Sequence, residues 1–360
     1  MKILIISLST YRRHLGIASV VRNLYINDIF KKEDITFLIY SNTEKPMIEE
    51  LNNNGYKVVL SEYRLKHPIK YFFFLYKLMK KEHYDIVHVH GNSALSVIDL
   101  LPAKLAGIKV RIMHSHSSSC SHMKLHSLLK PYFNTLCNVR YACTQDAGNF
   151  LFGKNEFIIL KNGIDETRYI FNQNKRNELR KQYGFEDKII VGHIGTLNEN
   201  KNQSFLIKLF YEYLKTKKNA ILYLIGEGKL RTDLTKLVEE LQIQDKVFME
   251  GIKNDANEDL NMFDYFIFPS LHEGFGLSPA EAQVNGLPVL ISDTVPMEVK
   301  INDNVYFMSL KDGVDCWNEK LLSLNMQRCP FSEEKFKKAG LCLQEIVSKL
   351  YDDYKNLVNH

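Results

Sequence analysis

Short apolar runs alternate with longer amphipathic stretches along the whole chain. The runs are rich in Val, Ile and Leu and are continuous rather than alternating, which is typical of strands buried on both faces. They therefore predict parallel strands separated by helices. The predicted strands cover residues 2–9, 35–41, 57–62, 85–90, 110–116, 139–144 and 157–163, then 188–195, 220–227, 246–252, 265–270 and 288–293.

The strand–helix rhythm restarts in the middle of the chain. After the polar stretch 162–185, a second Rossmann-like series begins at Lys188. A chain of 360 residues also exceeds the usual size of one domain. We therefore expect two α/β domains, residues 1–170 and 171–335, whose facing strand ends form a ligand-binding cleft. Residues 333–357 read as one or two polar helices, and we expect the segment 336–360 to pack back on the first domain.

Charge is distributed unevenly between the two halves. The net charge is +5, but residues 1–165 contain 22 Lys and Arg against 13 Asp and Glu, so the excess lies in the first half. A basic first half indicates an anionic partner, such as membrane lipid, a phosphorylated acceptor or nucleic acid. The alternative is a basic surface that only keeps the protein soluble.

The remaining bulk properties favour a reduced, cytoplasmic protein. Six cysteines occur without a CxxC pair, so we expect structural thiols rather than disulfides. The N-terminal MKILIISLSTYRR predicts a buried strand rather than a signal peptide. No run of 18 apolar residues occurs, so no membrane-spanning helix is expected.

Several common motifs are missing. There is no Walker loop, and no G-x-G-x-x-G follows the first predicted strand, which argues against a nicotinamide dehydrogenase. The paired histidines in HVH (88–90) and HSH (114–116) have no obvious carboxylate or cysteine nearby, so no metal site is predicted.

The stretch HEGFGLSPAEAQVNGLPVLISD, residues 272–293, has two interpretations. The structural one is a capping box, with Ser278 as N-cap, Pro279 at the first helical position and Glu281 at the third. Gly286 then suits the end of that helix. Capping does not explain Glu273, which stands before a turn containing two glycines.

The functional interpretation is a sugar-nucleotide site. Gly274 and Gly276 allow a sharp turn and a close approach of backbone to ligand. The amides of Gly276 and Leu277 would point from a helix N-terminus, where a diphosphate is favoured. Nearby carboxylates could accept hydrogen bonds from sugar or ribose hydroxyls.

This stretch closely resembles the Glu-x(7)-Glu signature of the family 4 retaining glycosyltransferases, which have the GT-B fold. Other segments resemble the family in order and spacing, namely HIGTLNENKNQSFLI (193–207), LIGEGKLRTDL (224–234), VFMEGIKND (247–255), DYFIFPS (264–270), LKNGIDETRY (160–169), IVHVHG (86–91) and RIMHSHS (111–117). The resemblance spans nearly the whole chain and is more specific in the C-terminal half. It is closest to the enzymes of capsular and exopolysaccharide synthesis.

The resemblance implies a role for each matching residue of the second half. Glu273 would contact the donor sugar near the reacting centre, and Lys201 would pair with the diphosphate and stabilise the leaving group. Glu281 would hold the ribose hydroxyls. The remaining contacts would be backbone amides for sugar and diphosphate and an apolar wall for the base, supplied by Phe275, Gly276, Leu277 and Ile252.

In the first half, the resemblance implies that Gly16 approaches the phosphates and that His116 lies near acceptor and sugar. His114 is the rival for the second role. Two departures stand out. Thr196 replaces the family's usual phosphate-binding arginine, and a hydroxyl cannot reproduce that bidentate contact. Leu15-Gly16 replaces a frequent pair of glycines.

We therefore expect a metal-independent, retaining hexosyltransferase that uses a nucleotide sugar, with UDP favoured, and no further cofactor. The expected acceptor is a lipid-linked sugar or an oligosaccharide in capsule or exopolysaccharide synthesis, and no nucleic acid is involved. Two alternatives are a nucleotide-sugar epimerase of the same fold and a non-catalytic partner subunit.

Two segments of the first half suggest a place at the inner face of the plasma membrane. Residues 63–84 and 123–140 combine lysines with dense aromatic residues, so both could lie on an anionic bilayer. In the alternative interpretation, Phe72, Phe73 and Phe74 partly pack on the sheet while the lysines are solvated.

Overall fold

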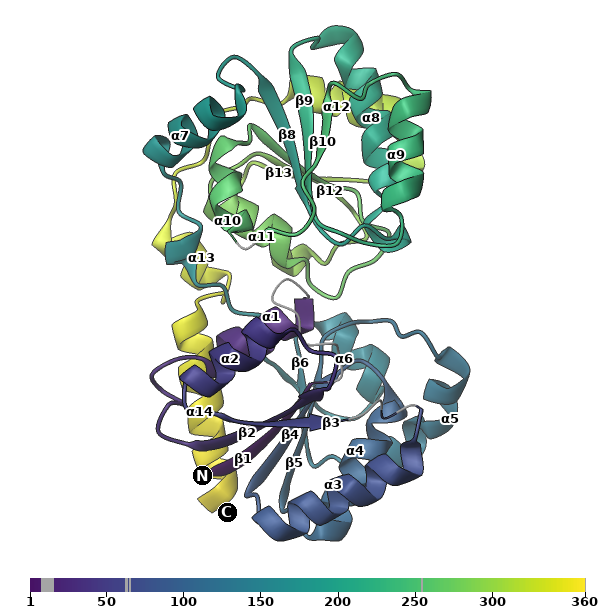
Figure 1. Cartoon of the computed structure of the whole chain (residues 1–360), viewed down its shortest axis with the longest axis vertical. Helices are drawn as coiled ribbons and strands as arrows, with labels where there is room; N and C mark the ends of the chain where they lie inside the picture. Colours follow the sequence, from purple (N-terminus) through teal and green to yellow (C-terminus); the bar gives the residue numbers. More distant parts are fainter. Residues whose placement is uncertain (8–15, 62–63, 65, 254, 360) are drawn as a thin grey trace. The chain divides into compact units, whose positions relative to one another are not determined.

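The computed structural model of the chain describes residues 1–7, 16–61, 64, 66–253 and 255–359. Contacts divide it into two compact units. Unit 1 comprises Met1–Gly163 and Leu341–His360, and unit 2 comprises Ile164–Gly340 (Figure 1). The chain thus returns to unit 1 after completing unit 2.

Unit 1 is a parallel sheet covered by helices, with strand order β3-β2-β1-β4-β5-β6-β7 in its described part. The strands are β1 (Lys2–Ser7), β2 (Asp34–Tyr40), β3 (Lys57–Ser61), β4 (Ile86–Gly91), β5 (Val110–Ser115), β6 (Val139–Ala142) and β7 (Ile158–Ile159). The helices are α1 (Gly16–Tyr25), α2 (Lys45–Asn53), α3 (Pro68–Glu82), α4 (Val97–Ala106), α5 (Met123–Phe133), α6 (Gln145–Phe152) and α14 (Leu343–Asn359).

Unit 2 repeats the plan with strand order β10-β9-β8-β11-β12-β13, again parallel. Its strands are β8 (Ile189–Ile194), β9 (Ala220–Ile225), β10 (Val247–Met249), β11 (Tyr265–Phe268), β12 (Val289–Ser292) and β13 (Val305–Met308). Its helices are α7 (Gln173–Tyr183), α8 (Gln203–Thr216), α9 (Arg231–Glu240), α10 (Ala256–Asp259), α11 (Leu277–Val284), α12 (Gly313–Ser323) and α13 (Glu333–Lys338).

Every strand that the apolar runs predicted is present, although β7 and β10 are shorter than their runs. Strand β13 was missed. It lies at the sheet edge and is mostly half-buried, so its four residues do not form a long apolar run. The C-terminal segment forms two helices, as the sequence allowed, but α14 is not polar all round, because it buries Ile346, Leu350 and Tyr354.

The strand order reverses direction at one point in each sheet. In unit 1, β1 lies between β2 and β4, and in unit 2, β8 lies between β9 and β11. The loops that follow the two strands at such a point diverge to opposite sides and leave a crevice at the carboxyl edge of the sheet. The loops after β8 and β11 are therefore where unit 2 should bind a ligand.

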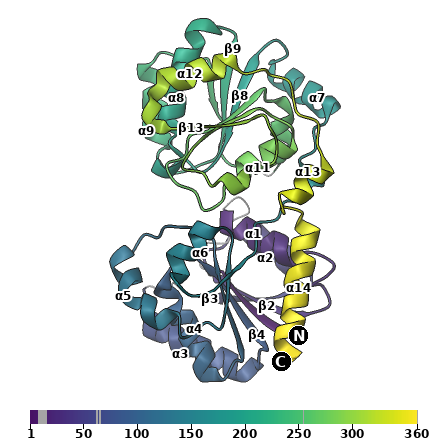
Figure 2. The same ribbon diagram turned by 180° about the vertical axis from the view of Figure 1, so that it is seen from behind.

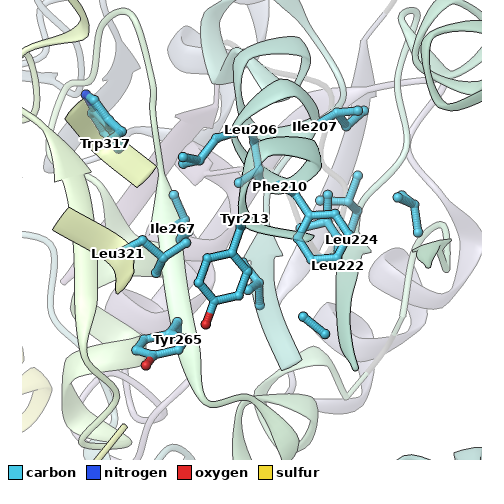
Figure 3. Close-up of a cluster of buried hydrophobic side chains, with 14 of the residues drawn as sticks. Leu206, Ile207, Phe210, Tyr213, Leu222, Leu224, Tyr265, Ile267, Trp317 and Leu321 are labelled. Carbon is cyan, nitrogen blue, oxygen red and sulfur yellow. The ribbon is translucent and has the colours of Figure 1, made fainter. Parts of the chain in front are cut away.

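The core of unit 2 lies between its sheet and the pair α8 and α12 (Figure 3). Helix α8 buries Leu206, Phe210 and Tyr213, a spacing that places all three on one face. They contact the buried strand residues in the same cluster, while Trp317 of α12 packs edge-on against Phe205 with ring centres 5.2 Å apart. This packing holds β8 and β11 rigidly side by side.

The core of unit 1 includes a polar cluster on one face of its sheet. His88 and His90 of β4 and His114 and His116 of β5 and its end are buried together, with His90 in register with His114. The ring centres of His88 and His90 are 4.1 Å apart, and those of His114 and His116 are 4.2 Å apart.

Two tyrosines reach this histidine cluster from helices. Tyr25 of α1 and Tyr354 of α14 are buried, and their hydroxyls lie 2.8 Å apart. Helix α14 lies alongside α1 in both views of unit 1 (Figures 1 and 2). Tyr354 therefore ties the last helix of the chain to the first unit.

Burial lowers the pKa of these histidines. The pKa of His116 falls to about 4, and those of His88, His90 and His114 lie well below the ordinary 6.5. The main cause is desolvation of the charged form. For His88, His90 and His114, repulsion from neighbouring imidazoles lowers the pKa further. The folded protein thus keeps these rings neutral at pH values where the unfolded chain would protonate them.

Acid should consequently destabilise the fold before its carboxylates titrate. Below pH 6.5 the unfolded state takes up protons that the folded state refuses, so the free energy of unfolding falls as pH drops from about 6.5 towards 4. Each histidine that stays neutral contributes a slope of roughly 1.4 kcal/mol per pH unit. Urea unfolding at pH 7.5, 6.5, 5.5 and 4.5 measures this dependence of the free energy of unfolding on pH.

The matched pair for this test is His114→Gln and His122→Gln, since His122 is exposed. The first substitution should flatten the dependence on pH, and the second should leave it unchanged. Equal slopes in the wild type and His114→Gln would contradict the assignment.

Candidate active site

Two loops of unit 2 are fastened to each other at the carboxyl edge of its sheet. The first follows β8 and contains a 3-10 turn, Glu199–Lys201, and the second follows β11. Asn200 joins them twice, because its carbonyl oxygen accepts from the amide of Leu271 at 2.7 Å and its side-chain amide donates to the carbonyl of His272 at 2.5 Å. The two loops therefore form one structural piece.

Lys201 and Glu273 meet in this piece. Lys201 Nζ lies 2.6 Å from Glu273 Oε1 and 4.5 Å from the centre of the Phe268 ring. The turn is fixed by Asn198, whose side chain accepts from the amide of Lys201 at 3.0 Å, and by Asn202, whose φ of 54° starts α8. The side chains of Lys201 and Glu273 are 19% and 11% exposed, so this pair can contact a ligand without unfolding of the loops.

Helix α11 begins beside this pair, but not where the sequence predicted. Its first residue is Leu277, and its N-cap is Gly276 with φ 95° and no side-chain cap. The predicted capping box is therefore wrong, because Ser278 lies inside the helix and Pro279 occupies the third helical position. A Cβ at Gly276 would lie 3.2 Å from both Pro279 Cγ and Val295 Cγ1, so this cap requires glycine.

The glycine cap has a chemical consequence. With no side chain over the helix start, the first-turn amides of Leu277 and Ser278 remain available to an anion. Phe275 is only 2% exposed, so its ring anchors the turn from the interior.

Glu281 is freed from capping and has another partner. The hydroxyl of Tyr169 donates to Glu281 Oε1 at 2.8 Å, and the carbonyl of Tyr169 accepts from the side chain of Asn285 at 2.7 Å. Burial raises the pKa of Glu281, and the bond from Tyr169 and the charge of Arg168 oppose that rise. Burial, followed by the neighbouring carboxylate, raises the pKa of Tyr169 far above 10.

The other predicted residues of unit 2 lie in the loops around this site. Thr196, after β8, is half-buried, and its carbonyl accepts from the side chain of Gln203 at 3.0 Å. Ile252 follows Gly251, whose φ is 71°, and its side chain is 53% exposed. Its apolar surface is thus available at the edge of the sheet, as a base-stacking role would need.

In unit 1, geometry separates the two rival histidines. His114 lies within β5 and has no exposed surface, whereas His116 lies just beyond the strand end and is 6% exposed. Of the two, His116 is therefore the better candidate for a ligand contact. Gly16 is the exposed first residue of α1, and an added Cβ there would meet no atom within 4 Å. Leu15 lies outside the described residues.

The histidine cluster gives little support for a shared metal ion, although ligand atoms of His88, His90 and His114 lie within 4.8 Å of one another. An imidazole binds a metal through a lone pair in its ring plane. The stacked rings of His88 and His90 are only 12° from parallel, so their planes do not meet at one ion. The sequence had not brought these residues together, because it does not show that the pairs share one face.

Three residues of the site were not singled out from the sequence. Asn200 joins the loops, Tyr169 orients Glu281, and Asn162 is the polar neighbour of His116. A signal existed for all three, since Asn200 lies beside Lys201 and both Asn162 and Tyr169 lie in the quoted segment 160–169. The partners of Asn200 and Tyr169 are 72 and 112 residues away, however, and only folding reveals them.

The two parallel-sheet units define a class of protein, the GT-B fold. Solved structures agree over almost the whole length. Anabaena HepE in complex with UDP and glucose has a TM-score of 0.82 at 16% identity, covering 99% of both chains. Sucrose-phosphate synthase of Thermosynechococcus elongatus has a TM-score of 0.80 at 13% identity, again covering 99% of both.

Sequence comparison finds relatives among the glycosyltransferases. Residues 175–324 match the model of glycosyl transferases group 1. The putative glycosyltransferase EpsF of Bacillus subtilis is 28% identical, covering 94% of this chain and 93% of that protein. An Escherichia coli UDP-Gal:alpha-D-GlcNAc-diphosphoundecaprenol alpha-1,3-galactosyltransferase is 26% identical, covering 61% of this chain and 60% of that protein. The family model and these relatives support the resemblance to the family 4 glycosyltransferases that the motifs indicated.

Removing the Tyr169 hydroxyl should weaken nucleotide binding through Glu281. In Tyr169→Phe the carboxylate loses the bond that orients it and lowers its pKa, so we expect UDP affinity to fall about threefold to tenfold. The loss should be larger at pH 5.5 than at pH 8, because the variant's Glu281 holds its proton to a higher pH. Calorimetry at both pH values measures it.

Tyr132→Phe is the matched control, since Tyr132 is 68% exposed in unit 1. A Tyr169→Phe protein that binds UDP like the wild type at both pH values would show that this hydrogen bond does not serve the nucleotide.

Proposed function

We propose that the protein transfers a hexosyl group from a UDP-sugar to a lipid-linked saccharide with retention of anomeric configuration. The observation that carries this proposal is the Lys201–Glu273 pair, held beside the start of α11 where the strand order reverses. A cation, free helix amides and a carboxylate within one rigid piece suit a diphosphate next to a sugar.

The relatives support the choice of donor and acceptor. The E. coli relative is named for a UDP-galactose donor and a diphosphoundecaprenol-linked acceptor, and HepE was solved with UDP and glucose. A Campylobacter jejuni relative, 27% identical over 51% of this chain, is likewise named for a diphospho-undecaprenol acceptor. The similarity to EpsF and to an O-antigen biosynthesis enzyme favours exopolysaccharide or capsule synthesis.

In the proposed reaction, an acceptor hydroxyl forms a bond to the anomeric carbon as the bond from that carbon to the diphosphate breaks. Lys201 and the amides of Leu277 and Ser278 stabilise the charge that develops on the departing UDP. Its phosphate oxygen takes the proton from the acceptor hydroxyl. Because these groups supply the positive charge, the proposal requires no metal and no cofactor beyond the donor.

Glu273 has two duties in this proposal. It accepts hydrogen bonds from hydroxyls of the donor sugar, and it holds Lys201 in place before the donor arrives. Glu281 holds the ribose and Ile252 the base. Thr196 offers only a hydroxyl where most of the family has an arginine, so Lys201 carries more of the diphosphate charge here. Gly16 and His116 are the proposed contacts from unit 1.

Glu273→Gln should abolish most of the transfer without unfolding the protein. The amide keeps the size of the side chain but removes the charge, so we expect turnover to fall roughly a hundredfold or more. The measurement is release of UDP from a panel of UDP-sugars with undecaprenyl-diphosphate saccharide, with NMR of the product to read the anomeric configuration.

Glu298→Gln is the control, because Glu298 is an exposed glutamate outside the site. Near-normal turnover by Glu273→Gln would refute the assignment, and an inverted product would refute retention. A donor converted without acceptor would instead identify an epimerase. The absence of any turnover, with UDP still bound, would favour a non-catalytic partner subunit.

We further propose that unit 1 rests on an anionic membrane. Helix α4 contacts both α3 and α5, and these three helices expose large apolar side chains, namely Ile69, Phe73, Phe74, Leu105, Met123, Leu125, Leu128 and Tyr132. Exposed lysines such as Lys77 and Lys124 lie on the same helices. Such a mixture suits insertion of apolar side chains among anionic headgroups.

The structure describes both segments that suggested this interaction, apart from residues 63 and 65. Phe73 and Phe74 are 55% and 38% exposed, whereas Phe72 is half-buried, so the alternative of partial packing fits Phe72 better than its two neighbours. Among the described helices, none is both long and apolar enough to cross a bilayer.

Flotation with vesicles of phosphatidylglycerol and phosphatidylcholine tests this surface. The wild type should float at low salt. The double variant Phe73→Ser with Leu128→Ser should reduce the floating fraction severalfold, because each substitution removes apolar area that would be buried in the bilayer. Met297→Ser with Met326→Ser, at exposed positions of unit 2, is the control. Equal flotation of both double variants, or none of the wild type, would contradict the proposal.

A further inference from the structure

The chain stays extended beyond the end of β8. The amide of Gly195 donates to the carbonyl of Ile225 at 2.9 Å. The amide of Leu197 donates to the carbonyl of Glu227 at 3.1 Å, so the pairing with β9 continues past the strand. In an extended chain, the backbone polar groups of successive residues point to opposite sides. Thr196 therefore directs its amide and its carbonyl away from β9, towards the side of β11.

Only one of these two groups of Thr196 has a partner. Its carbonyl accepts from Nε2 of Gln203 at 3.0 Å, whereas its amide has no hydrogen-bond partner among the residues that the structure describes. Thr196 is half-buried and lies at the carboxyl edge of the sheet, where the strand order reverses between β8 and β11. Unpaired backbone N–H groups are rare in folded proteins, so this amide requires an acceptor from outside the chain.

The carbonyl of Thr196 is held by a pair of buried side chains. Gln203, the first residue of α8, has no exposed surface, and its Nε2 also lies 3.2 Å from Nε2 of His193. Nδ1 of His193 lies 2.9 Å from the carbonyl of Ile267 in β11. The His193–Gln203 pair thus connects β11 to the loop after β8.

The protons of this pair are fixed by two carbonyls, which can only accept. The carbonyl of Ile267 requires the proton of neutral His193 on Nδ1, which leaves Nε2 as an acceptor. The carbonyl of Thr196 requires the amide nitrogen of Gln203 on its side, and the second hydrogen of that nitrogen reaches His193. Using both hydrogens leaves Oε1 of Gln203 without a partner in the described part of the chain. The reverse orientation would place that oxygen against the carbonyl of Thr196.

His193 stays neutral in the folded protein. Burial lowers the pKa of His193 to about 4, the bond to the carbonyl of Ile267 opposes this shift, and the charge of Lys201 adds to it. Nε2 of His193 therefore remains able to accept from Gln203 at neutral pH, and the pair keeps its arrangement.

We propose that Thr196 contacts the diphosphate of the donor through its backbone amide, and that Gln203 and His193 are the positioning residues that hold this amide in place. The side chain of Thr196 offers a hydroxyl where the family has an arginine. The amide offers a donor that is already ordered, so binding loses little conformational entropy. The inference rests on the proposed function for the identity of the anion, but not for the arrangement of the three residues.

The amide can be followed directly. Spectra of protein labelled with ¹⁵N-threonine contain its signal, which Thr196→Ser assigns by removing it. We expect UDP to move the amide proton of Thr196 downfield, because a hydrogen bond to a charged phosphate oxygen is short and strong. Saturating uridine, which lacks the diphosphate, should not do so. A Thr196 proton that does not move downfield when UDP binds would overturn the proposal.

A matched pair of variants tests the positioning residues. Gln203→Met keeps the size of the side chain and removes both donated bonds. We expect its affinity for UDP to fall about tenfold and its affinity for uridine to stay unchanged, because only the diphosphate contact depends on the pair. Tyr265→Phe is the control, since it also removes a buried bond to a backbone carbonyl, that of Leu324 at 3.0 Å, but at the start of β11. It should bind UDP like the wild type.

The proposal and the proposed function fail differently. Long-range ¹H–¹⁵N spectra of ¹⁵N-histidine-labelled protein report the tautomer of His193, and His193→Asn assigns its signal. A proton on Nε2 would refute the His193–Gln203 pair, whatever the protein binds. Equal loss of UDP and uridine affinity in Gln203→Met would show that Gln203 only stabilises the fold. A wild type with His193 as Nδ1–H that binds no UDP would refute the proposed donor and leave the arrangement of the pair intact.

Discussion

The Lys201–Glu273 pair depends on two strands, β8 and β11, that are adjacent in space and far apart in the chain. Opposite charges placed on separate flexible loops would gain little, because ordering them costs conformational entropy and water screens them. Here the ordering is done in advance by the packed sheet, by α8 and by the two bonds of Asn200. The pair therefore exists before a ligand arrives, and binding needs only a local exchange of partners.

The other predicted ligand contacts are also held in position before a ligand binds. Gly276 starts α11 without a side-chain cap and leaves its first amides available, and Tyr169 holds Glu281 from a segment at the start of unit 2. In unit 1, the buried ring of His90 holds His116 through a bond of 3.0 Å between their nitrogens. Each potential ligand contact is thus supported by a neighbour that a ligand would not touch, which reduces the entropy that binding must overcome.

The polar histidine cluster in the core of unit 1 has two effects, one on stability and one on specificity of packing. Keeping four imidazoles neutral inside the sheet should make the fold sensitive to acid, a cost that an apolar core would avoid. In return, the hydrogen bonds specify one arrangement of rings, which apolar packing cannot do. The C-terminal helix takes part through Tyr354, so the last helix of the chain contributes to the site of the first unit.

The sequence by itself determined the parallel α/β architecture, because strands buried on both faces must be continuous apolar runs. It also marked Lys201, Glu273 and Glu281, because their spacing follows a family signature. It failed at β13, whose edge position needs little apolar surface, and at the capping box, where a good local cap at Ser278 lost to the tight packing of Gly276 against Val295. Only the tertiary structure decided which partners those residues have, since Tyr169, Asn200 and the histidine cluster depend on contacts between distant segments. Local patterns record propensity and burial, whereas hydrogen-bond partners are set by which strands become neighbours.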